Sequence, residues 1–402
     1  MKPLLFCLLV SVPFVLAADS PSFRGPQRNG KFPETGLLKT WPLAGPTEVW
    51  SITGLGESYA SVSVVGNTIY TTGKNELEGY LFAISTSGKL LWQTRYGNES
   101  DGKGYPGTRS TPEISGDKLY FFTGPGKLLA LKTLDGSKVW ERDILKDFEG
   151  TNPNFFYSES VLVDGDNVIC MPGGKGASVV ALNKNTGETV WRTKDVSDKA
   201  SYCSARIFDN GTIRQVIVLT AVSMLGIDPK TGDVHWRYEY PTKYDIHAVS
   251  PVFQGNSLYV SDGSKQGGKA FALAEDGKSV RLLWEEKSLD VLLGGVVQHE
   301  GYLYGSSSGG TWMCLDFKTG AVLARSRDLG QGAVIFADGL LYGYDEKGMV
   351  ALIDPNPKNF KSISYFQVEK GSGQHWSHPV IVNKRLYIRH GSDLICYDIA
   401  AS

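Results

Sequence analysis

The chain repeats one short hairpin pattern along almost its whole length, and this repeat limits the possible folds more than any other feature. Its clearest copy is residues 179–191, where an apolar stretch, a turn containing Gly187 and a second stretch ending in Trp191 follow one another. Self-similar units at a fixed spacing are the signature of repeat architectures, so the fold is assigned before any single motif is interpreted. Weaker copies lie at 82–92, 129–140, 225–236, 271–284, 313–324, 350–363 and, in truncated form, 395–399.

Each unit opens with a small residue, continues as an apolar strand and a turn, and usually reaches an aromatic residue nine positions later, as from Ser61 to Tyr70. The turns carry Gly and Asn, which tolerate the positive φ of tight hairpins. A period of roughly 45 residues leaves room for four short strands. We therefore predict an all-β fold, an eight-bladed β-propeller of four-stranded antiparallel blades. The opening residues are Ser61, Thr111, Ser160, Ser204, Ser250, Gly295, Ala333 and His378.

The eighth unit, residues 377–399, ends before its fourth strand. The isolated stretch Glu48–Ile52 carries Trp50 at the position of the repeat Trp, so we predict that this N-terminal strand completes the last blade and closes the ring. Closure removes two unpaired sheet edges. The repeat Trp residues are expected to pack between neighbouring blades, and units six and seven lack one. They are Trp50, Trp92, Trp140, Trp191, Trp236 and Trp284.

Three segments are predicted along the chain. Residues 1–17 read as a secretory signal peptide, with Lys2, an apolar run and Ala17 at the cleavage site. Residues 18–46 are rich in Pro and Gly and are expected to form an irregular arm on the surface of the domain. Residues 47–402 form the propeller domain. We therefore expect an exported protein, periplasmic or secreted.

Composition limits the partners. A formal net charge of −1 over 402 residues argues against nucleic acid or an anionic membrane as a partner held by bulk electrostatics. After the leader, no stretch is apolar enough to span a bilayer. A monomer is expected.

The positions of the cysteines and histidines bear on possible disulfides and metal sites. Cys314 and Cys396 stand where other units have Ala, so both are expected to be buried and free. Cys170 and Cys203 lie in adjacent units, and an oxidising compartment leaves open whether they form a disulfide. No metal site is expected: His375 and His378 have zinc-like spacing, but in an extended segment their side chains point to opposite faces.

The repeat alignment also locates a candidate site. In a propeller, the segments entering the innermost strands surround one mouth of the axis, and here they gather charged and aromatic residues that the repeat does not need. Such a mixture suits a small polar, carbohydrate-like or planar ligand. The residues two places before the opening residues are expected to form a ring around this mouth. Besides predicted ligand-binding residues, this ring includes Ser158, Ala248 and Leu293. The predicted ligand-binding residues are Tyr59, Arg109, Tyr157, Glu159, Tyr202, His247, Gln331, Trp376 and His378.

Residues 181–191 and 226–236, with Asn183 or Asp228 before Thr-Gly and a closing Trp, resemble the PQQ-like β-propeller repeat, and the resemblance covers roughly residues 45–399. This repeat occurs in quinoprotein alcohol dehydrogenases, in the lipoprotein of the outer-membrane barrel assembly machinery and in many exported bacterial proteins. The resemblance therefore implies an eight-bladed propeller, and it leaves three functions open.

The first hypothesis is a non-catalytic binding or scaffold protein that requires no cofactor and binds a small ligand or another envelope protein. The second is an alcohol dehydrogenase-like oxidoreductase that depends on pyrroloquinoline quinone (PQQ) with calcium. Arg109, Trp376 and Glu159 supply fragments of such a site, but the chain has no adjacent Cys pair and no Cys-x-x-Cys-His haem motif. The third is an outer-membrane protein assembly factor.

Overall fold

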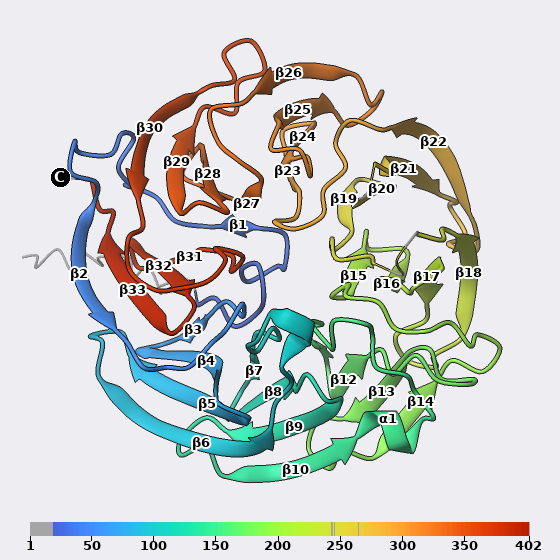
Figure 1. Ribbon diagram of the computed structural model, residues 1–402. Coiled ribbons are helices and arrows are strands. Elements are labelled where there is room, and N and C mark those ends of the chain that lie inside the picture. The colour runs from blue at the N-terminus through green and yellow to red at the C-terminus, as the bar shows by residue number, and fades with distance from the viewer. Residues whose placement is uncertain (1–18, 243, 245, 264, 402) are drawn as a thin grey trace, which may run out of the picture.

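The structure, a computed structural model that describes residues 19–242, 244, 246–263 and 265–401, has eight β-sheets arranged around a central axis. Seven sheets hold four consecutive antiparallel strands, one of them extended by a fifth, and the eighth combines the last three strands with β2 from near the N-terminus (Figure 1). The predicted all-β, eight-bladed propeller is confirmed. The predicted signal peptide, residues 1–17, lies outside the described residues.

The first four blades run from the axis outward in chain order. Blade 1 holds β3 (Ser63–Val65), β4 (Thr68–Asn75), β5 (Glu78–Ser85) and β6 (Leu90–Asn98). Blade 2 holds β7 (Glu113–Ser115), β8 (Lys118–Phe122), β9 (Lys127–Lys132) and β10 (Lys138–Asp143). Blade 3 holds β11 (Leu162–Asp164), β12 (Asn167–Cys170), β13 (Val180–Asn183) and β14 (Thr189–Arg192). Blade 4 holds β15 (Arg206–Asp209), β16 (Arg214–Leu219), β17 (Ser223–Ile227) and β18 (Val234–Glu239).

The other four blades follow the same order. Blade 5 holds β19 (Val252–Gln254), β20 (Ser257–Asp262), β21 (Gly267–Leu273) and β22 (Val280–Glu286). Blade 6 holds β23 (Val297–His299), β24 (Tyr302–Ser306), β25 (Trp312–Asp316) and β26 (Val322–Ser326). Blade 7 holds β27 (Gly332–Ala337), β28 (Leu340–Asp345), β29 (Met349–Ile353) and β30 (Ser362–Gln367), and blade 8 holds β31 (Val380–Val382), β32 (Arg385–His390) and β33 (Asp393–Asp398). The short helical turns are η1 (Gly102–Gly104) and α1 (Ile144–Asp147).

The ring closes as predicted. Strand β2 (Thr47–Ile52) pairs antiparallel with β33 as the outermost strand of blade 8, and Trp50 stands opposite Cys396. The strand that precedes blade 1 in the chain is therefore held in blade 8 by main-chain hydrogen bonds.

The Gly and the Trp of the repeat meet between neighbouring blades. Gly187 in blade 3 has φ +74, and a Cβ there would lie 2.8 Å from the ring of Trp140 in blade 2. The indole Nε1 of Trp140 donates to the carbonyl of Lys184, 3.0 Å away in the same turn. Two features therefore require Gly at position 187: its φ is positive, and the ring of Trp140 leaves no room for a Cβ. The same indole-to-carbonyl bond joins Trp50 to Thr86, Trp92 to Thr133, Trp191 to Pro229 and Trp284 to Phe317.

Trp236 in blade 4 reaches the next blade through an intermediate. Its Nε1 donates to Oε1 of Gln215, 2.9 Å away, and Nε2 of Gln215 donates to the carbonyl of Gly277 in blade 5, 2.6 Å away. A side-chain amide thus extends the contact in this one blade.

Blades 6 and 7 have Ala324 and Ser364 at the position of the repeat Trp, as their pairing registers show. At the outer edge of blade 7, Trp41 from the N-terminal segment packs its ring edge-on against Phe366, with ring centroids 5.3 Å apart. The N-terminal segment therefore supplies an aromatic ring to a blade that lacks the repeat Trp.

The prediction that the N-terminal arm lies on the surface is wrong for residues 20–32. Strand β1 (Lys31–Phe32) pairs parallel with β27, the innermost strand of blade 7, and the arm crosses the middle of the ring (Figure 1). Arg24 and Arg28 are only 3% and 6% exposed. Arg28 donates to the carbonyls of Ser160 and Val161 and to the carboxylate of Glu113. A polar, Gly-rich sequence can be buried here because the inner strands offer it hydrogen-bond acceptors.

All four cysteines of the described chain are buried and free. The expectation for Cys314 and Cys396 is confirmed, and the open question about Cys170 and Cys203 is answered, because no disulfide joins them. Within the described residues, no helix has the length and apolar character needed to cross a bilayer.

Candidate functional site: the channel mouth

A cavity of about 420 Å³ opens at the end of the axis where the innermost strands begin. Every blade contributes to its wall through the segment that enters its first strand. The residues that stand two places before the eight opening residues all line it: Tyr59, Arg109, Ser158, Tyr202, Ala248, Leu293, Gln331 and Trp376.

Aromatic rings follow one another around half of this mouth. Trp376 lies between Tyr59 and Tyr105, with ring centroids 4.9 Å and 5.2 Å away. Tyr105 lies 6.3 Å from Phe155, which in turn lies 6.5 Å from Tyr202. These five rings, the aromatic arc, come from the segments that lead into blades 8, 1, 2, 3 and 4. Ile246, Ala248, Leu292 and Leu293 line the opposite side.

Arg109 is the cation at the rim. Its Nη1 donates to the carbonyl of Gly107, 3.0 Å away, and its Nη2 to the carbonyl of Tyr105, 2.6 Å away. The guanidinium carbon lies 5.4 Å from the ring centroid of Tyr59. Burial lowers the pKa of Arg109 from its ordinary value of 12.5. These contacts fix the guanidinium against the aromatic arc.

The N-terminal arm forms the floor of the cavity through Phe23 and Arg24. Nη1 of Arg24 lies 3.1 Å from the carbonyl of Gly294 and 3.2 Å from Nδ1 of His378, and its Nη2 lies 2.7 Å from the carbonyl of Val296. Because a guanidinium only donates, Nδ1 of His378 must accept, which leaves the proton on Nε2. Burial, with the charge of Arg24, holds the pKa of His378 well below its usual range. His378 is therefore a neutral residue of the cavity floor.

Six of the nine predicted ligand-binding residues line the cavity: Tyr59, Arg109, Tyr202, Gln331, Trp376 and His378. Tyr157, Glu159 and His247 are not among its lining residues, and each bonds to the backbone elsewhere, to Pro172, Met171 and Tyr240 respectively. Their positions explain this difference. They lie one or three places before an opening residue, and alternate side chains of an extended segment point to opposite sides.

The sequence interpretation missed several residues of the site. Phe23 and Arg24 belong to the arm, and Tyr105 and Phe155 lie in connections between blades, where the repeat gives no register. Glu346 comes from the turn between β28 and β29. Its carboxylate accepts a hydrogen bond of 2.7 Å from the indole of Trp376. The only available signal was the occurrence of large aromatic residues in the loops.

The lining residues do not fit a quinone held with calcium. Such a pair needs carboxylate ligands for the metal and free donors for three quinone carboxylates. Glu346, the only carboxylate in the described lining, already accepts from Trp376, and Arg109 donates to two main-chain carbonyls. Across the described parts of the chain, no group of three His, Cys, Asp or Glu side chains could hold a metal ion.

The fold and this mouth define an eight-bladed propeller of PQQ-like repeats. A family model described as the outer membrane protein assembly factor BamB matches residues 40–157 and 78–326, which together cover more than half of the chain. The chain therefore belongs to this family of PQQ-like repeat propellers.

Two curated relatives match more distantly. A quinoprotein ethanol dehydrogenase of Pseudomonas aeruginosa is 26% identical over 157 residues, which cover 36% of this chain and 24% of the relative. An outer membrane protein assembly factor BamB of Nitrosomonas eutropha is 24% identical over 155 residues, which cover 39% of this chain and 34% of the relative. The chain thus spans about a quarter to a third of the length of these relatives.

Solved structures share the fold. BamB of Moraxella catarrhalis superposes with a TM-score of 0.65 at 18% identity and covers 88% of this chain and 97% of its own. A quinohemoprotein alcohol dehydrogenase of Comamonas testosteroni gives a TM-score of 0.72 at 12% identity, covering 96% of this chain and 81% of its own. At such identities the likeness concerns the fold alone.

Proposed function

We propose that this protein is an exported binding propeller that holds a small ligand in the channel mouth without transforming it. The observation that carries the proposal is the aromatic arc of Tyr59, Trp376, Tyr105, Phe155 and Tyr202 around one cavity. The blades do not need these rings, because blade contacts are made by the repeat Trp residues farther out.

The chemistry of the wall favours a carbohydrate-like ligand. Aromatic faces pack against the apolar faces of sugar rings and other flat molecules. A few convergent polar groups then fix the orientation of the bound ligand, as in most small-molecule sites. Arg109, Gln331 and Glu346 are placed to do this.

A non-catalytic role agrees with the state of the polar groups. His378 is neutral and accepts from Arg24, so its Nδ1 is not available as a base. Among the described lining residues, no Ser hydroxyl is hydrogen-bonded to a His or a carboxylate, the pairing that activates a nucleophile. Export is proposed from the leader sequence at residues 1–17.

A calorimetric screen of neutral monosaccharides and disaccharides against the purified protein tests the proposal. Arg109→Ala should weaken the binding of a hit by roughly 1.5–3 kcal/mol, the value of a hydrogen bond that involves a charged group. Trp376→Ala should weaken it as well, through loss of stacking. Tyr365→Ala is the matched control, because Tyr365 is an exposed aromatic residue on an outer strand. A ligand whose affinity is indifferent to Arg109, Trp376 and His378 together would place the site elsewhere.

The same purified protein can be used to test the alternative function, a PQQ-dependent oxidoreductase. Purified protein is mixed with PQQ and calcium, and the absorbance spectrum and the heat of mixing are recorded. Stoichiometric binding of PQQ, together with oxidation of an added alcohol, would overturn the non-catalytic proposal.

A second candidate function is that of an envelope assembly factor. It is favoured by the family model described as an outer membrane protein assembly factor, which matches residues 40–157 and 78–326. The partner would then be another envelope protein. Co-purification with an outer-membrane assembly complex, retained in Arg109→Ala and Trp376→Ala, would support this role over a ligand at the mouth.

A further inference from the structure

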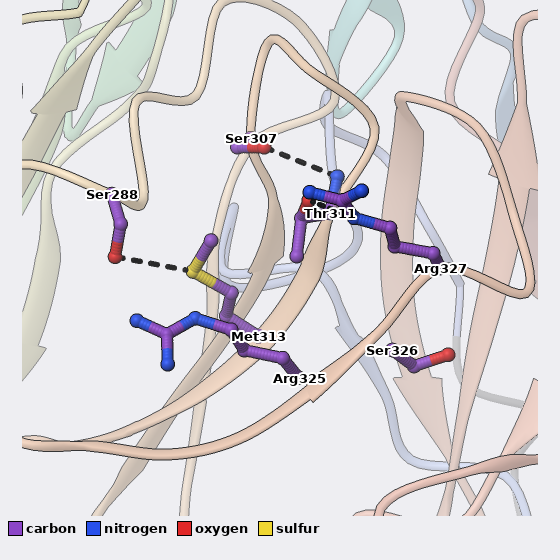
Figure 2. Close-up of a pocket in the computed structure, with 7 residues that line it drawn as sticks. All are labelled: Ser288, Ser307, Thr311, Met313, Arg325, Ser326 and Arg327. Carbon is purple, nitrogen blue, oxygen red and sulfur yellow. Dashed lines mark hydrogen bonds between the residues drawn. The ribbon is translucent and has the colours of Figure 1, made fainter.

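A second pocket, of about 470 Å³, lies at the edge of blade 6 away from the axis. Figure 2 shows its residues, which come from the turn between β24 and β25, from β25, from the end of β26 and from the segment that leads into the blade. Four hydroxyl side chains and two guanidinium groups line it together with Met313. They are Ser288, Ser307, Thr311, Ser326, Arg325 and Arg327.

The pocket carries positive charge without a matching acid. Arg327 donates from Nε to Oγ1 of Thr311, 3.3 Å away, and none of the described residues is hydrogen-bonded to Arg325. In the part of the chain that the structure describes, no carboxylate lies within ion-pair distance of either guanidinium. Most of the other arginines on outer strands do have such a partner, as Arg95 has Glu78 and Arg142 has Asp147.

Blade 4 contains the same arrangement with a carboxylate inside it. Asp198, only 8% exposed, comes from the segment that leads into that blade. Its Oδ2 accepts from Oγ of Thr220 at 2.9 Å and from the hydroxyl of Ser223. Its Oδ1 accepts from Nη2 of Arg237 at 3.0 Å. Two hydroxyls and one arginine thus surround a carboxylate.

The strand registers make the outer strands of the two blades equivalent, although the turn between the second and third strands is one residue longer in blade 6. Arg237 pairs with Leu225 in blade 4 as Arg325 pairs with Met313 in blade 6, in each case on the outermost two strands. Thr220 and Ser223 flank the turn between the second and third strands of blade 4.

Ser307 and Thr311 flank the corresponding turn of blade 6. The amide of the first turn residue donates to the carbonyl of the last over 2.8 Å in both blades, from Thr220 to Ser223 and from Ser307 to Thr311. Blade 6 therefore keeps the hydroxyls and the arginine of blade 4.

The carboxylates near the blade 6 pocket are bonded to other groups in the described chain, not to its guanidinium groups. Ser288, from the segment that leads into the blade, lines the pocket, and its hydroxyl donates to Glu286. Asp290 of the same segment accepts from the amide and the hydroxyl of Ser308. Two residues after the shared arginine, blade 4 has Glu239, and blade 6 has Arg327. The donors of the blade 4 site are thus kept in blade 6, and no described carboxylate pairs with Arg325 or Arg327 as Asp198 pairs with Arg237.

We propose that the blade 6 pocket binds the carboxylate of a small hydroxy acid, such as a sugar acid. Arg325 takes the role that Arg237 has toward Asp198, and the buried hydroxyls of Ser307 and Thr311 take the roles of Thr220 and Ser223. Charge-assisted hydrogen bonds from a guanidinium are the strong contacts of such a site. The volume of about 470 Å³ accommodates a monosaccharide, and the hydroxyl-rich wall suits its alcohol groups. None of these residues lines the channel mouth.

Titration calorimetry with sodium glucuronate, glucose and glucose 6-phosphate tests the proposal on the intact protein. We expect glucuronate to bind with an affinity that falls as salt is added, and glucose to bind at least about tenfold more weakly. Arg325→Gln should weaken glucuronate about tenfold or more. The matched control is Arg281→Gln, which removes an exposed arginine from the outer strand of blade 5, outside the pocket.

Ser288→Asp gives an independent test, because it places a carboxylate on the segment that carries Asp198 in blade 4. This variant should lose glucuronate binding, and its melting temperature is recorded because the change also removes the hydrogen bond that the Ser288 hydroxyl donates to Glu286. Equal affinities for glucuronate and glucose would overturn the proposal, as would unchanged binding in Arg325→Gln. Binding of glucose 6-phosphate without glucuronate would also overturn it, because the site would then select phosphate.

Discussion

Arg28 of the N-terminal arm donates a hydrogen bond of 2.6 Å from Nη1 to Oε2 of Glu113 on the innermost strand of blade 2, and both side chains are almost fully buried. The hydroxyl of Ser22 donates to the other oxygen of the same carboxylate over 2.7 Å. The arm is thus tied to the ring on the side opposite β1, which pairs with blade 7. The axis of this propeller is filled by its own N-terminal segment.

Removing this contact should be far more costly than removing an exposed ion pair. Arg28→Ala leaves the carboxylate of Glu113 buried without its cation, and we expect the free energy of unfolding to fall by about 3–5 kcal/mol. Lys39→Ala is the control. Its ammonium lies 2.8 Å from Asp338, but the lysine side chain is 58% exposed, so a loss of at most about 1 kcal/mol is expected. Urea denaturation of both variants provides the measurement, and equal losses would show that the arm is not anchored here.

The contact between Gly and Trp can be isolated within blade 3. Gly187→Ala and Gly165→Ala both place a side chain at positive φ, +74 and +58, which costs roughly 1–2 kcal/mol at either position. Only at Gly187 does the added Cβ meet the ring of Trp140, because nothing lies within 4 Å of Gly165. We expect Gly187→Ala to lose about 1–3 kcal/mol more than Gly165→Ala. Similar midpoints of denaturation in the two variants would mean that the indole does not pack as described.

The four described cysteines should be unreactive in the folded protein. Burial raises the pKa of Cys203 and Cys396 to about 12 and that of Cys314 to about 11, and Cys170 is shifted in the same direction. The thiolate is the reactive form, so a thiol reagent at neutral pH should titrate none of them. In denaturant without a reductant all four should react. A count that rises only after reduction would reveal a disulfide.

Glu159 should make stability depend on pH. Its Oε2 accepts from the amide of Met171, its Oε1 has no partner, and burial raises its pKa to about 8 from an ordinary 4.5. Between these values the native state holds a proton that the unfolded chain has released. The stability due to this proton is complete below about pH 4.5, and it is lost as the pH rises to about 8.

Glu159→Gln should flatten that part of the profile of unfolding free energy against pH. A residual slope of the same sign is expected, because burial also raises the pKa of Asp262 and of Glu113 to about 7. Glu188→Gln, at an exposed position, should leave the profile unchanged. Identical profiles for Glu159→Gln and the parent protein would show that Glu159 is ionised in the folded state.

The location of the mouth could be predicted because the repeat fixes a register in every blade. Each opening residue starts an innermost strand, so the residue two places earlier must lie at the same end of the axis in all eight blades. Tyr59, Arg109, Tyr202 and Trp376 were found in this way. The same register misplaced Tyr157, Glu159 and His247, because odd offsets in an extended segment turn the side chain away from the cavity.

The sequence by itself determined the number of blades, the closing strand and the packing of the repeat Trp residues between blades, because these follow from local hairpins repeated at a fixed spacing. The tertiary structure alone decided where the arm lies, since the acceptors for Arg24 and Arg28 belong to blades that are 85 to 354 residues away in the chain. It alone also matched the pocket of blade 6 to the carboxylate site of blade 4. That equivalence rests on side chains from three separate segments of each blade, and only the folded sheets bring those segments together.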